Sequence, residues 1–507
     1  MTEGGERKPG PGYQGSERSS ADFTIYPQKG DPILVSSPLL GHIKMANTQG
    51  YDPMSMAPAL VSLNTSKSMG AASGTWTATI KPPRNPKARD PLSQIVDDDW
   101  VDIVFKRHGK VWHVMRGLID EVRVNKSVGG SGATVRTYTI TGRDFGSIFE
   151  RTNIWFSPYT DAMITGGLAL KVFGGEMNVY GKPGKVVDGF LFGFMRELAG
   201  VGRAVWKIPS SVPTYGGFNF AEALNLDAKG ILNEPNRIAI NANYMMPEGN
   251  IWQLAQEWSD PAFCELFCDT LPPGPSAKVD DELTIGQTLM KVILRDRPFP
   301  VVDGGLSPNG MASPYFSLPL HIIPVQAVVS SNLGRSGTER FNSFHLSPQI
   351  AQELTGAGAL DLVAPLWNPD DILHHGMRRY DIQSHYVSEK AELLILSKAQ
   401  RTRIRDWHCI NSYLLNGTIN LGRGFPEIRI GERVRLVGPG SPQTDQTFYV
   451  EQVSHNWQFG GSIKTSLGVT RGWTGDDNSY LTALTQLTSK YKDARIRQPS
   501  DVGPVEP

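Results

Sequence analysis

One pattern occurs twice in the sequence, and it constrains the fold more than any other feature. Near residue 119, Ile119-Asp120-x-Val122 is followed by a glycine pair and then by Tyr138-x-Ile140-Thr141. Near residue 450, Val450-Glu451-x-Val453 is followed by a glycine pair and then by Leu467-x-Val469-Thr470. Alternating apolar residues on both sides of such a turn are typical of a β-hairpin. We therefore expect one hairpin arrangement in two copies, with Ile119 equivalent to Val450 and Thr141 to Thr470. Two unrelated hairpins of similar composition are the alternative.

Length and composition favour a turn-rich β protein with several domains. The 507 residues are enough for three or four domains of about 150 residues each. The 53 glycines and 36 prolines favour turns over long helices. Four or five antiparallel strands are predicted between residues 75 and 141, and comparable strands return between residues 417 and 470. Each group suggests a small antiparallel barrel or sandwich.

Five segments are expected along the chain. Residues 1–20, rich in glycine, proline and charge, should form a flexible arm. Residues 21–154 should form the first β unit, and residues 155–375 an α+β insertion. Residues 376–473 should form a helix, at 389–407, followed by the second β unit. Residues 474–507 should form a C-terminal helix and tail. Within the insertion we expect helices near 186–198 and 251–258, and short buried strands at 262–269 and 290–295.

The charge pattern excludes some classes of protein. Lys and Arg together number 50, as do Asp and Glu, so the formal net charge is zero. A sequence-independent nucleic-acid binder needs a basic excess, which this chain lacks. No stretch approaches the roughly 18 apolar residues of a membrane span. The acidic N-terminus has no apolar core and is not expected to be a secretion signal.

Catalytic motifs are not found. The sequence contains no HExxH, GxSxG or GxxxxGK[ST] pattern. The run at 181–185 has the composition of a phosphate-binding loop, but Val186 replaces the hydroxyl residue that would hold Mg²⁺. We read it as a turn before a helix, and we expect no enzymatic activity and no catalytic residues.

Three groups of residues could suggest a metal site, and each has a simpler interpretation. Cys264 and Cys268 lack a second pair nearby and are expected to be small buried side chains, with Cys409 far away in sequence. The histidines are expected to be ordinary loop residues: His374, His375 and His385. The acidic run 97–99 is expected to be a solvated turn, with an inter-subunit salt bridge as the alternative. We therefore expect no metal and no cofactor.

Several segments together resemble one family, the baseplate hub proteins of long-tailed bacteriophages, which include the hub part of type VI secretion spikes. The segments span roughly residues 70–475 and carry these motifs: Gly142-Arg143-Asp144, Trp252-Gln253-Leu254, Asp260-Pro261-Ala262-Phe263, Leu294-Arg295-Asp296-Arg297-Pro298-Phe299, Asn332-Leu333-Gly334-Arg335-Ser336, residues 419–430, and Tyr449-Val450-Glu451 with Val469-Thr470-Arg471-Gly472. Each motif is short, and the match depends on their order and spacing. The middle insertion and the C-terminal helix depart from the family pattern.

The resemblance implies a fold and a role. The fold would hold two related antiparallel β-barrel tube domains, which form a pseudo-sixfold ring in a homotrimer. Such a ring would join a sixfold tail tube to a threefold central spike and line the DNA channel. The implied partners are the tail tube or distal tail protein, the spike, and, as a further candidate, the tape-measure protein. DNA would only pass through. The implied location is the virion tail, after assembly in the host cytoplasm.

Three other functions are alternatives to this one. The hub of a related contractile injection machine would be similar, but no β-helical needle follows residue 475. A tail-associated hydrolase of cell wall or glycan would need two carboxylates or a Cys/His pair in one cleft. A carbohydrate- or receptor-binding β protein would cluster its aromatic residues on one face, whereas here they are spread through the predicted strands.

The C-terminal helix offers the candidate assembly residues. Leu481, Leu484, Leu487 and Tyr491 recur at helical spacing and form an apolar stripe. An isolated helix of this length is marginal in water, so the stripe should be covered. We expect it to dock on a neighbouring copy or on a spike or tube partner; packing on its own chain is the alternative.

Overall fold

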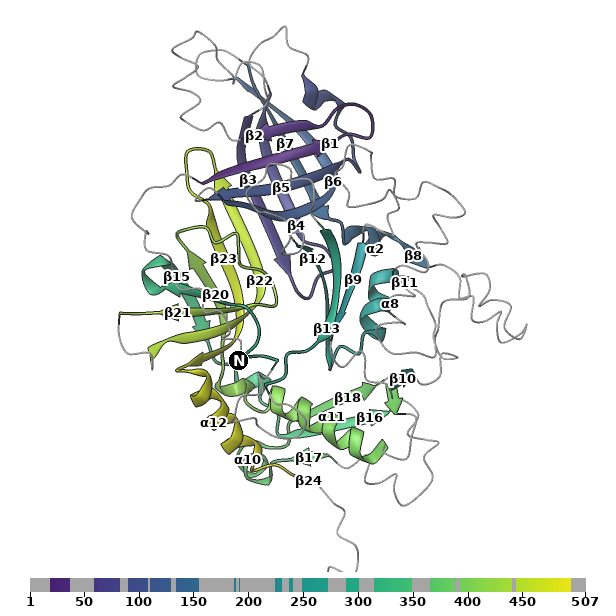
Figure 1. Ribbon diagram of the computed structural model, residues 1–507, viewed down its shortest axis with the longest axis vertical. Helices are drawn as coiled ribbons and strands as arrows, with labels where there is room; N and C mark the ends of the chain where they lie inside the picture. Colours follow the sequence, from purple (N-terminus) through teal and green to yellow (C-terminus); the bar gives the residue numbers. More distant parts are fainter. Residues whose placement is uncertain are drawn as a thin grey trace, which may run out of the picture.

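The computed structural model describes most of the two β-rich regions and parts of the segments between them. The described residues are 19–36, 59–82, 90–107, 110–128, 134–154, 187, 191, 224–229, 237–239, 249–271, 289–300, 314–348, 365–384, 386–388, 393–439 and 444–493. Residues 1–18 of the expected N-terminal arm, the loop at 181–185 and most of the predicted helix at 186–198 lie outside them. The last two residues of the predicted arm differ from that expectation, because Ser19 and Ser20 are buried and Ser20 begins a strand. The described chain is mainly antiparallel β with few helices, as expected (Figure 1).

A thirteen-stranded sheet forms most of the molecule. Its first part, here the first unit, contains seven strands: β1 (Ser20–Tyr26), β2 (Ile33–Ser36), β3 (Ala59–Ser68), β4 (Thr75–Lys81), β5 (Trp100–Arg107), β6 (Lys110–Val128) and β7 (Thr134–Asp144). Their pairings run β3-β2-β1-β5-β6-β7-β4 and return to β3. The link between β2 and β3 is a single residue pair, Ser36 with Ala59.

The second part of the sheet, here the second unit, contains six strands. They are β14 (Leu320–Pro324), β15 (Val328–Gly334), β20 (Leu415–Leu421), β21 (Arg433–Val437), β22 (Gln446–Gln458) and β23 (Lys464–Thr474). Their pairings run β15-β20-β23-β22-β21-β14 and do not return to β15 among the described residues. Two fully closed barrels, as the resemblance implies, are therefore not seen in the described part of the single chain.

The strands β14 and β15 differ from the sequence-based division. They lie inside the span 155–375, which the sequence assigns to the insertion, yet they pair with β21 and β20 of the second unit. Proline-rich loops around them hid this membership in the sequence. Just before the insertion lie α2 (Ser147–Arg151) and β8 (Asn153–Ile154), and β11 (Gly249–Asn250) of the insertion pairs with β8.

A helix and a three-stranded sheet continue the insertion. The helix α8 (Ile251–Trp258) begins with a capping box in which Asn250 and Gln253 each accept a backbone N–H of the other residue. The sheet contains β9 (Leu224–Lys229), β12 (Cys264–Leu271) and β13 (Leu289–Asp296). The strands predicted at 262–269 and 290–295 and the helix predicted at 251–258 are thus confirmed, within a few residues.

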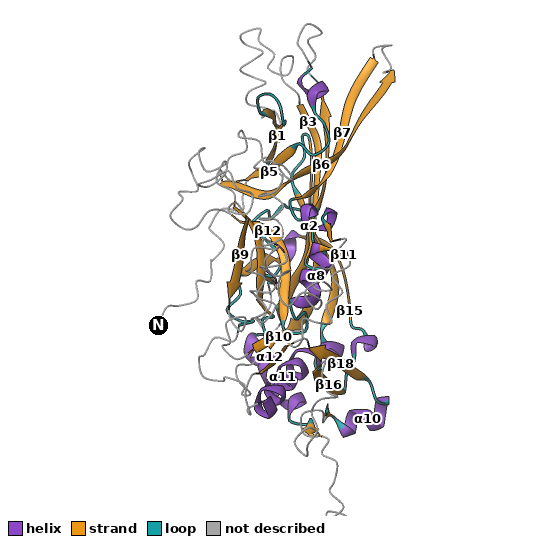
Figure 2. Cartoon of the chain, turned by 90° about the vertical axis from the view of Figure 1, so that its right-hand side faces the viewer, coloured by secondary structure: helices purple, strands orange, loops and turns teal. Residues whose placement is uncertain are grey.

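The helical end of the molecule lies at the bottom of Figure 1 and below the sheet in Figure 2. It contains α10 (Pro369–His375), α11 (Leu393–His408) and α12 (Asp477–Thr488). Short strands accompany them: β10 (Arg237–Ala239), β16 (Ser343–Pro348), β17 (Leu366–Trp367), β18 (Arg379–Ser384), β19 (Tyr386–Ser388) and β24 (Lys492–Asp493). No helix within the described residues is long and apolar enough to cross a membrane.

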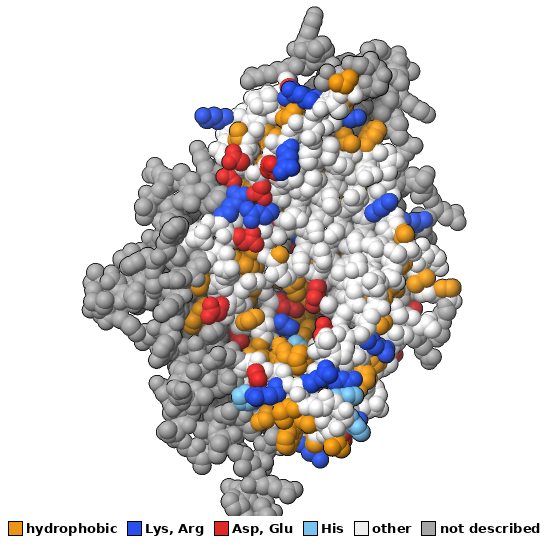
Figure 3. Space-filling model, turned by 180° about the vertical axis from the view of Figure 1, so that it is seen from behind, with side chains coloured by type: hydrophobic (Ala, Val, Ile, Leu, Met, Phe, Trp, Pro, Cys, Tyr) orange, Lys and Arg blue, Asp and Glu red, His pale blue; other side chains and the backbone are white. Residues whose placement is uncertain are grey.

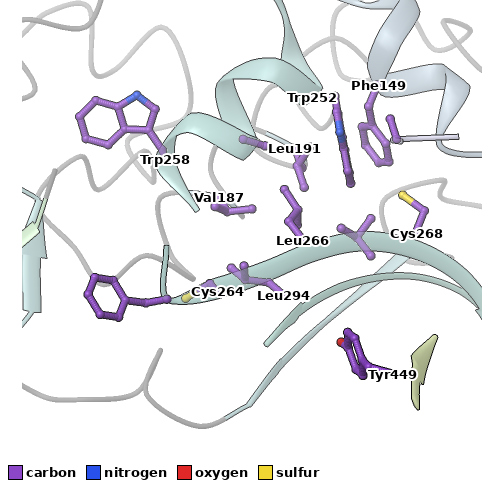
Figure 4. Close-up of a cluster of buried hydrophobic side chains, with 14 of the residues drawn as sticks. Phe149, Val187, Leu191, Trp252, Trp258, Cys264, Leu266, Cys268, Leu294 and Tyr449 are labelled. Atoms are coloured by element: carbon purple, nitrogen blue, oxygen red, sulfur yellow. The ribbon is translucent and has the colours of Figure 1, made fainter. Parts of the chain in front are cut away.

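Separate apolar cores support the two units and the insertion. The first unit surrounds Phe23, Trp76 and Ile140, and the second surrounds Ile419, Phe448 and Leu467. The third and largest core joins α8, β12 and β13 to α12. Figure 4 shows part of it, where Trp252 and Phe149 lie near Leu266 of β12.

Candidate functional site

The two units share the order and pairing of six strands, and this duplication is the candidate functional feature of the chain. Six strands of each unit follow one another in the same chain order and pair in the same order: β1, β3, β4, β5, β6 and β7 correspond to β14, β15, β20, β21, β22 and β23. They differ at the first strand, because β1 is antiparallel to β5 whereas β14 is parallel to β21. A chance match of two hairpins does not explain six strands, so the duplication predicted from the sequence is confirmed.

The duplicated hairpin contains the same irregularity in both copies. In the β6–β7 pair the register shifts at Asp120, between Ile119 and Glu121. In the β22–β23 pair it shifts at Glu451, between Val450 and Gln452. The acid recognised at a fixed position in the sequence is therefore the extra residue of a β-bulge in each copy.

The predicted equivalence of Ile119 with Val450 is confirmed by these bulges, but that of Thr141 with Thr470 is wrong. Thr141 lies opposite Glu121, the residue after the bulge, and the residue opposite Gln452 at that place is Gly468. The sequence alignment slipped by two residues on the second strand. Side chains alternate with a period of two along a strand, so a slip of two keeps every apolar residue on the same face and cannot be detected from the pattern.

A second shared bulge was missed in the sequence. The β3–β4 register shifts at Val61, and the β15–β20 register shifts at Val329. The residues around these two positions are similar, Ala-Leu-Val-Ser-Leu-Asn at 59–64 and Ala-Val-Val-Ser-Ser-Asn at 327–332. This short match was the signal that could have placed β15 in the second unit.

The acids at the hairpin bulges are held by nearby side chains. Asp120 forms ion pairs with Arg143, at 2.9 Å, and with Arg151 at the end of α2. Glu451 accepts a hydrogen bond of 3.0 Å from the hydroxyl of Thr470. Bulges bend a strand and increase its twist, so these positions shape the curvature of each unit.

One face of the duplicated sheet is polar and carries few charged residues, among them Glu121, Arg123 and Lys464. Buried apolar residues alternate along the strands with small polar residues on the opposite face, which are partly or fully exposed: Ser62, Asn64, Ser66, Thr75, Thr77, Thr79, Asn125, Ser127, Thr137, Thr139, Thr141, Ser330, Asn332, Thr418, Asn420, Gln452, Ser454, Asn456 and Ser466. Hydrogen bonds join neighbouring strands across this face, for example from Asn420 to Ser330 at 3.0 Å. We call this the polar face. It offers many hydrogen-bonding groups and no marked excess of positive or negative charge.

The two units meet where β3 pairs with the second half of β22, an interface that we call the internal seam. Seven residue pairs align the strands antiparallel, from Ser68 opposite Gln452 to Ser62 opposite Gln458. Main-chain hydrogen bonds extend it at both ends, from Met69 N–H to Glu451 and from Phe459 N–H to Val61. The side chains of Ser454 and Ser66 are also joined, at 2.9 Å.

A buried charge network lies behind the internal seam. Lys67 of β3 is 3.0 Å from Asp269 of β12 and 3.6 Å from Asp144 at the end of β7. Arg429, which precedes β21, is 2.9 Å from Asp269. The network joins both units to the insertion. It borders a cavity lined also by His113 and His455, whose volume of about 20 Å³ has room for a water molecule but not for a substrate.

Burial and neighbouring charges shift the pKa values of the two carboxylates in this network in opposite directions. Burial raises the pKa of Asp144 to about 6, although Lys67 opposes this. Burial acts to raise the pKa of Asp269 as well, but Lys67 and Arg429 outweigh it and hold that pKa below its ordinary value. Burial also lowers the pKa of His113 to about 4 and that of His455 to about 3, so both rings are neutral at pH 7. This pattern is typical of a structural junction, because Lys67 and Arg429 are both paired with Asp269.

A second junction ties the insertion to the second unit. The carboxylate of Glu265 on β12 accepts hydrogen bonds from Arg295, at 3.0 Å, and from the Tyr449 hydroxyl, at 2.8 Å. Arg295 also donates to the carbonyl of Gly431 at 2.9 Å. Burial raises the pKa of the Tyr449 hydroxyl well above its ordinary value, so it stays a donor.

The C-terminal stripe packs on this chain. Leu484 has no exposed surface and lies in the largest core, and Leu487 and Tyr491 pack against that core from its edge. Leu481 is half-buried. The contact with a partner that the sequence suggests for this stripe therefore stays a prediction, and Leu484 is unsuitable for testing it because it belongs to the chain's own core.

The acidic run differs from the expected solvated turn. Asp99 is fully buried and accepts backbone N–H groups of Gln28 and Val96, each at 2.9 Å. Asp98 forms an ion pair with Arg151 of the same chain. Asp98 also has a φ of 62°, a left-handed conformation that aspartate tolerates better than most residues.

The other residues considered as ligands are also placed. Cys264 and Cys268 lie on strand β12 rather than on a helix, and both are buried thiols, as is Cys409. His374 and His375 end helix α10, while the side chain of His385 lies outside the described residues. Within the described part of the chain, no three His, Cys, Asp or Glu side chains gather as metal ligands would.

Comparisons with known proteins add the following. No protein-family model and no curated protein match the sequence. Among solved structures, the fold is similar to a tail protein from Neisseria meningitidis MC58, with 11% identity over 89% of this chain and 96% of the other and a TM-score of 0.45. It is similar to the 43 kDa tail protein of prophage MuSo2 from Shewanella oneidensis, with 12% identity over 89% and 98% of the chains and a TM-score of 0.46. A third is an E. coli component of the type VI secretion system, with 9% identity over 83% and 75% of the chains and a TM-score of 0.40.

Proposed function

We propose that this chain is a structural hub at the tip or baseplate of a bacteriophage tail. Three copies would form a ring that joins the sixfold tail tube to a threefold central spike. The observation that carries the proposal is the duplicated unit, with its six corresponding strands and two shared bulges. A ring of three such chains presents six equivalent units on one side while keeping three-fold symmetry overall, which is what a joint between these symmetries requires.

The polar face supports a role for the ring as a channel. A sheet has one face for its core and one for solvent, and here the solvent face carries mainly serine, threonine, asparagine and glutamine, with a few charged residues such as Glu121, Arg123 and Lys464. Phosphates bind to lysine and arginine, so a lining of neutral side chains lets DNA pass without being held. Charges on the side of the molecule seen in Figure 3 are also of both signs and intermixed. We propose that the polar face lines the DNA channel.

The proposed partners follow from this role. They are two further copies of the chain, the tail tube or distal tail protein on one side, and the central spike on the other, with the tape-measure protein as a further candidate. The segment division, with β14 and β15 reassigned to the second unit, and the closure of both units into barrels belong to the same proposal. The proposed location is the virion tail, after assembly in the host cytoplasm.

Labelled tail particles test the proposal. A C-terminal affinity tag is added to the chain, and purified particles are imaged by electron cryomicroscopy with a gold-conjugated ligand for the tag. We expect the label at the tail end, close to the axis, with three copies in each particle. Label along the tail shaft or on peripheral fibres, or tails that lack the chain, would contradict the proposal. Label at the tip of a particle without a DNA-filled head would identify the hub of a contractile injection machine instead.

A further inference from the structure

Several strand edges of the duplicated sheet have no partner among the described residues, and two of them match each other. One edge belongs to β15, which pairs only with β20. The other belongs to the second half of β6, residues 121–128, which pairs with β7 but lies beyond the reach of β5. The β6–β7 hairpin extends past the neighbouring strands in Figure 2. Unpaired edges present rows of free N–H and C=O groups and favour pairing with another strand.

These two free edges are the counterparts of the two strands that form the internal seam. In the duplication β15 corresponds to β3, and β6 corresponds to β22. The internal seam joins β3 of the first unit to the second half of β22 of the second unit. The same pair of edges, with the two units exchanged, has no partner in the part of the chain that the structure describes. Two edges of one chain that match an existing interface of the same chain fit another copy of that chain.

Burial differs in the way an empty seam requires. In the internal seam, Thr65 and His455 lie opposite each other and are each 2% exposed. Val124, the counterpart of His455, is 44% exposed. Val329 and Val128, the counterparts of Val61 and Phe459, are 74% and 75% exposed, whereas Phe459 is 45% exposed at the end of the internal seam. Exposed valines on an unpaired strand edge are unusual for a monomer and indicate a covered surface.

We propose that β15 of one copy pairs antiparallel with the second half of β6 of the next copy, in the register of the internal seam. This inference rests on the proposed ring and names the contact that closes it. Applying the seven pairs of the internal seam to the counterpart strands places Ser330 opposite Ser127, Asn332 opposite Asn125 and Leu333 opposite Val124. Val329 and Val128 then meet at the end of the contact.

The pairing also continues the polar face from one chain to the next. Ser330 and Asn332 already lie on that face beside Asn420 and Thr418, and Asn125 lies on it beside Thr137. With β15 and β6 paired, Ser330 and Asn332 of one copy become adjacent to Ser127 and Asn125 of the next. On the other face Leu333 becomes adjacent to Val124, and Ser331 to Lys126, because paired residues in a sheet point to the same side.

Cysteine cross-linking tests both the contact and its register. Main-chain hydrogen bonding at the internal seam marks Val61 and Phe459 as a hydrogen-bonded pair, so Ser62 and Gln458 form a closer, non-hydrogen-bonded pair. Their counterparts are Ser330 and Ser127. At such positions Cα atoms are about 4.5 Å apart, within the range of a disulfide. The variant Ser330→Cys with Ser127→Cys, in the full-length chain under mild oxidation, should give covalent species up to a closed trimer on a non-reducing gel.

A shifted pair of cysteines serves as the matched control. Ser330→Cys with Arg123→Cys uses the same strands and the same face, but the two residues would be four positions out of register, about 13 Å apart along the strand. We expect little or no covalent trimer from it, and none from either single variant. Equal cross-linking of the shifted pair, or trimers in solution that Ser330→Cys with Ser127→Cys fails to link, would overturn the proposed seam.

This result is separable from the proposed function. If tail particles carry the label at their tip but the cysteines do not link, the seam is wrong and the hub remains. If the cysteines link efficiently but the chain is absent from tail tips, the seam is right and the hub proposal fails. Linking of Ser330→Cys to a different protein in assembled particles, with none between copies, would also overturn the seam.

Discussion

At the scale of single residues, Asp144 and Asp269 show how one buried cation supports two carboxylates unequally. Both are fully buried and both lie within 4 Å of Lys67. Asp269 also forms an ion pair with Arg429. Asp144 has no second cation beside it in the described part of the chain, and its other contacts are backbone hydrogen bonds. The second cation determines the direction of each pKa shift. Burial outweighs the effect of Lys67 and raises the pKa of Asp144, whereas Lys67 and Arg429 together outweigh burial and lower the pKa of Asp269. Stability should therefore depend on pH through these two groups in opposite directions.

The first prediction concerns Asp144. Its pKa is about 6 in the folded chain against an ordinary value of 3.8 when the chain is unfolded, so the folded state binds its proton more tightly. The stabilisation from this group is present below pH 3.8 and is lost as pH rises through 6, a change on the order of 3 kcal/mol. Asp144→Asn removes this dependence. We expect the variant to gain stability relative to the wild type between pH 4 and pH 7, measured by denaturant unfolding.

The control for this prediction is Asp31→Asn, which removes one charge from an exposed turn and leaves the buried network unchanged. Its stability relative to the wild type should vary much less over the same pH range. A parallel pH profile for Asp144→Asn and the wild type would show that Asp144 titrates in the folded chain as it does in the unfolded one.

The second prediction concerns the C-terminal stripe. Leu484→Asp places a carboxylate in the largest core and should destabilise the chain by about 3 kcal/mol or more, because the charge has no partner there. Leu481→Asp is the matched control, since Leu481 is half-buried on the same helix. We expect it to leave the melting temperature of the subunit nearly unchanged. Thermal unfolding of both variants by circular dichroism measures the difference.

The control variant also keeps the original partner hypothesis testable. If Leu481→Asp folds but blocks assembly of tails, the stripe contacts a partner at that residue. If it assembles normally, the stripe serves only the fold of its own chain. Equal stability of the two variants would mean that Leu484 does not lie in the core.

At the scale of elements, the sequence predicted what depends on local pattern. Alternation of apolar residues predicted the β6–β7 and β22–β23 hairpins, and helical spacing predicted α8. The register of the second copy was wrong by two residues because the pattern has that same period. Bulges have no strong local signature, so their presence at Asp120 and Glu451 could not be read in advance.

Membership of strands in the sheet depends on contacts between distant residues. The strand β15 carries exposed residues at every position from 329 to 332, so it has no alternation from which to predict a strand. The charge network joins residues from four separate segments, and no spacing in the sequence brings Lys67, Asp144, Asp269 and Arg429 together. The candidate site could thus be predicted as a duplication but not as an assembled surface.

At the scale of the whole molecule, the balanced charge and the polar face have the same consequence for DNA. The lining is mostly neutral, with Arg123 and Lys464 among its few exposed cations, so a ring lined in this way should hold duplex DNA weakly at physiological salt. The duplication offers a clean way to change this. Thr77 and Thr418 occupy equivalent positions of the two units, on β4 and β20, and both lie on the polar face. Lysine at both positions would add two charges to each chain.

The last prediction is that Thr77→Lys with Thr418→Lys converts a neutral channel into a DNA-binding one. In a ring of three chains the two substitutions place lysines at all six units, and their combined attraction should tighten binding by roughly tenfold or more at low salt. The affinity should then fall steeply as salt rises. Fluorescence anisotropy of a labelled duplex, titrated with trimer at several salt concentrations, measures both effects. The control Thr482→Lys with Gln486→Lys adds the same charge to exposed positions of α12. If this control binds DNA as tightly as the channel variant, the polar face is not the lining, because the gain would depend on net charge rather than on its position.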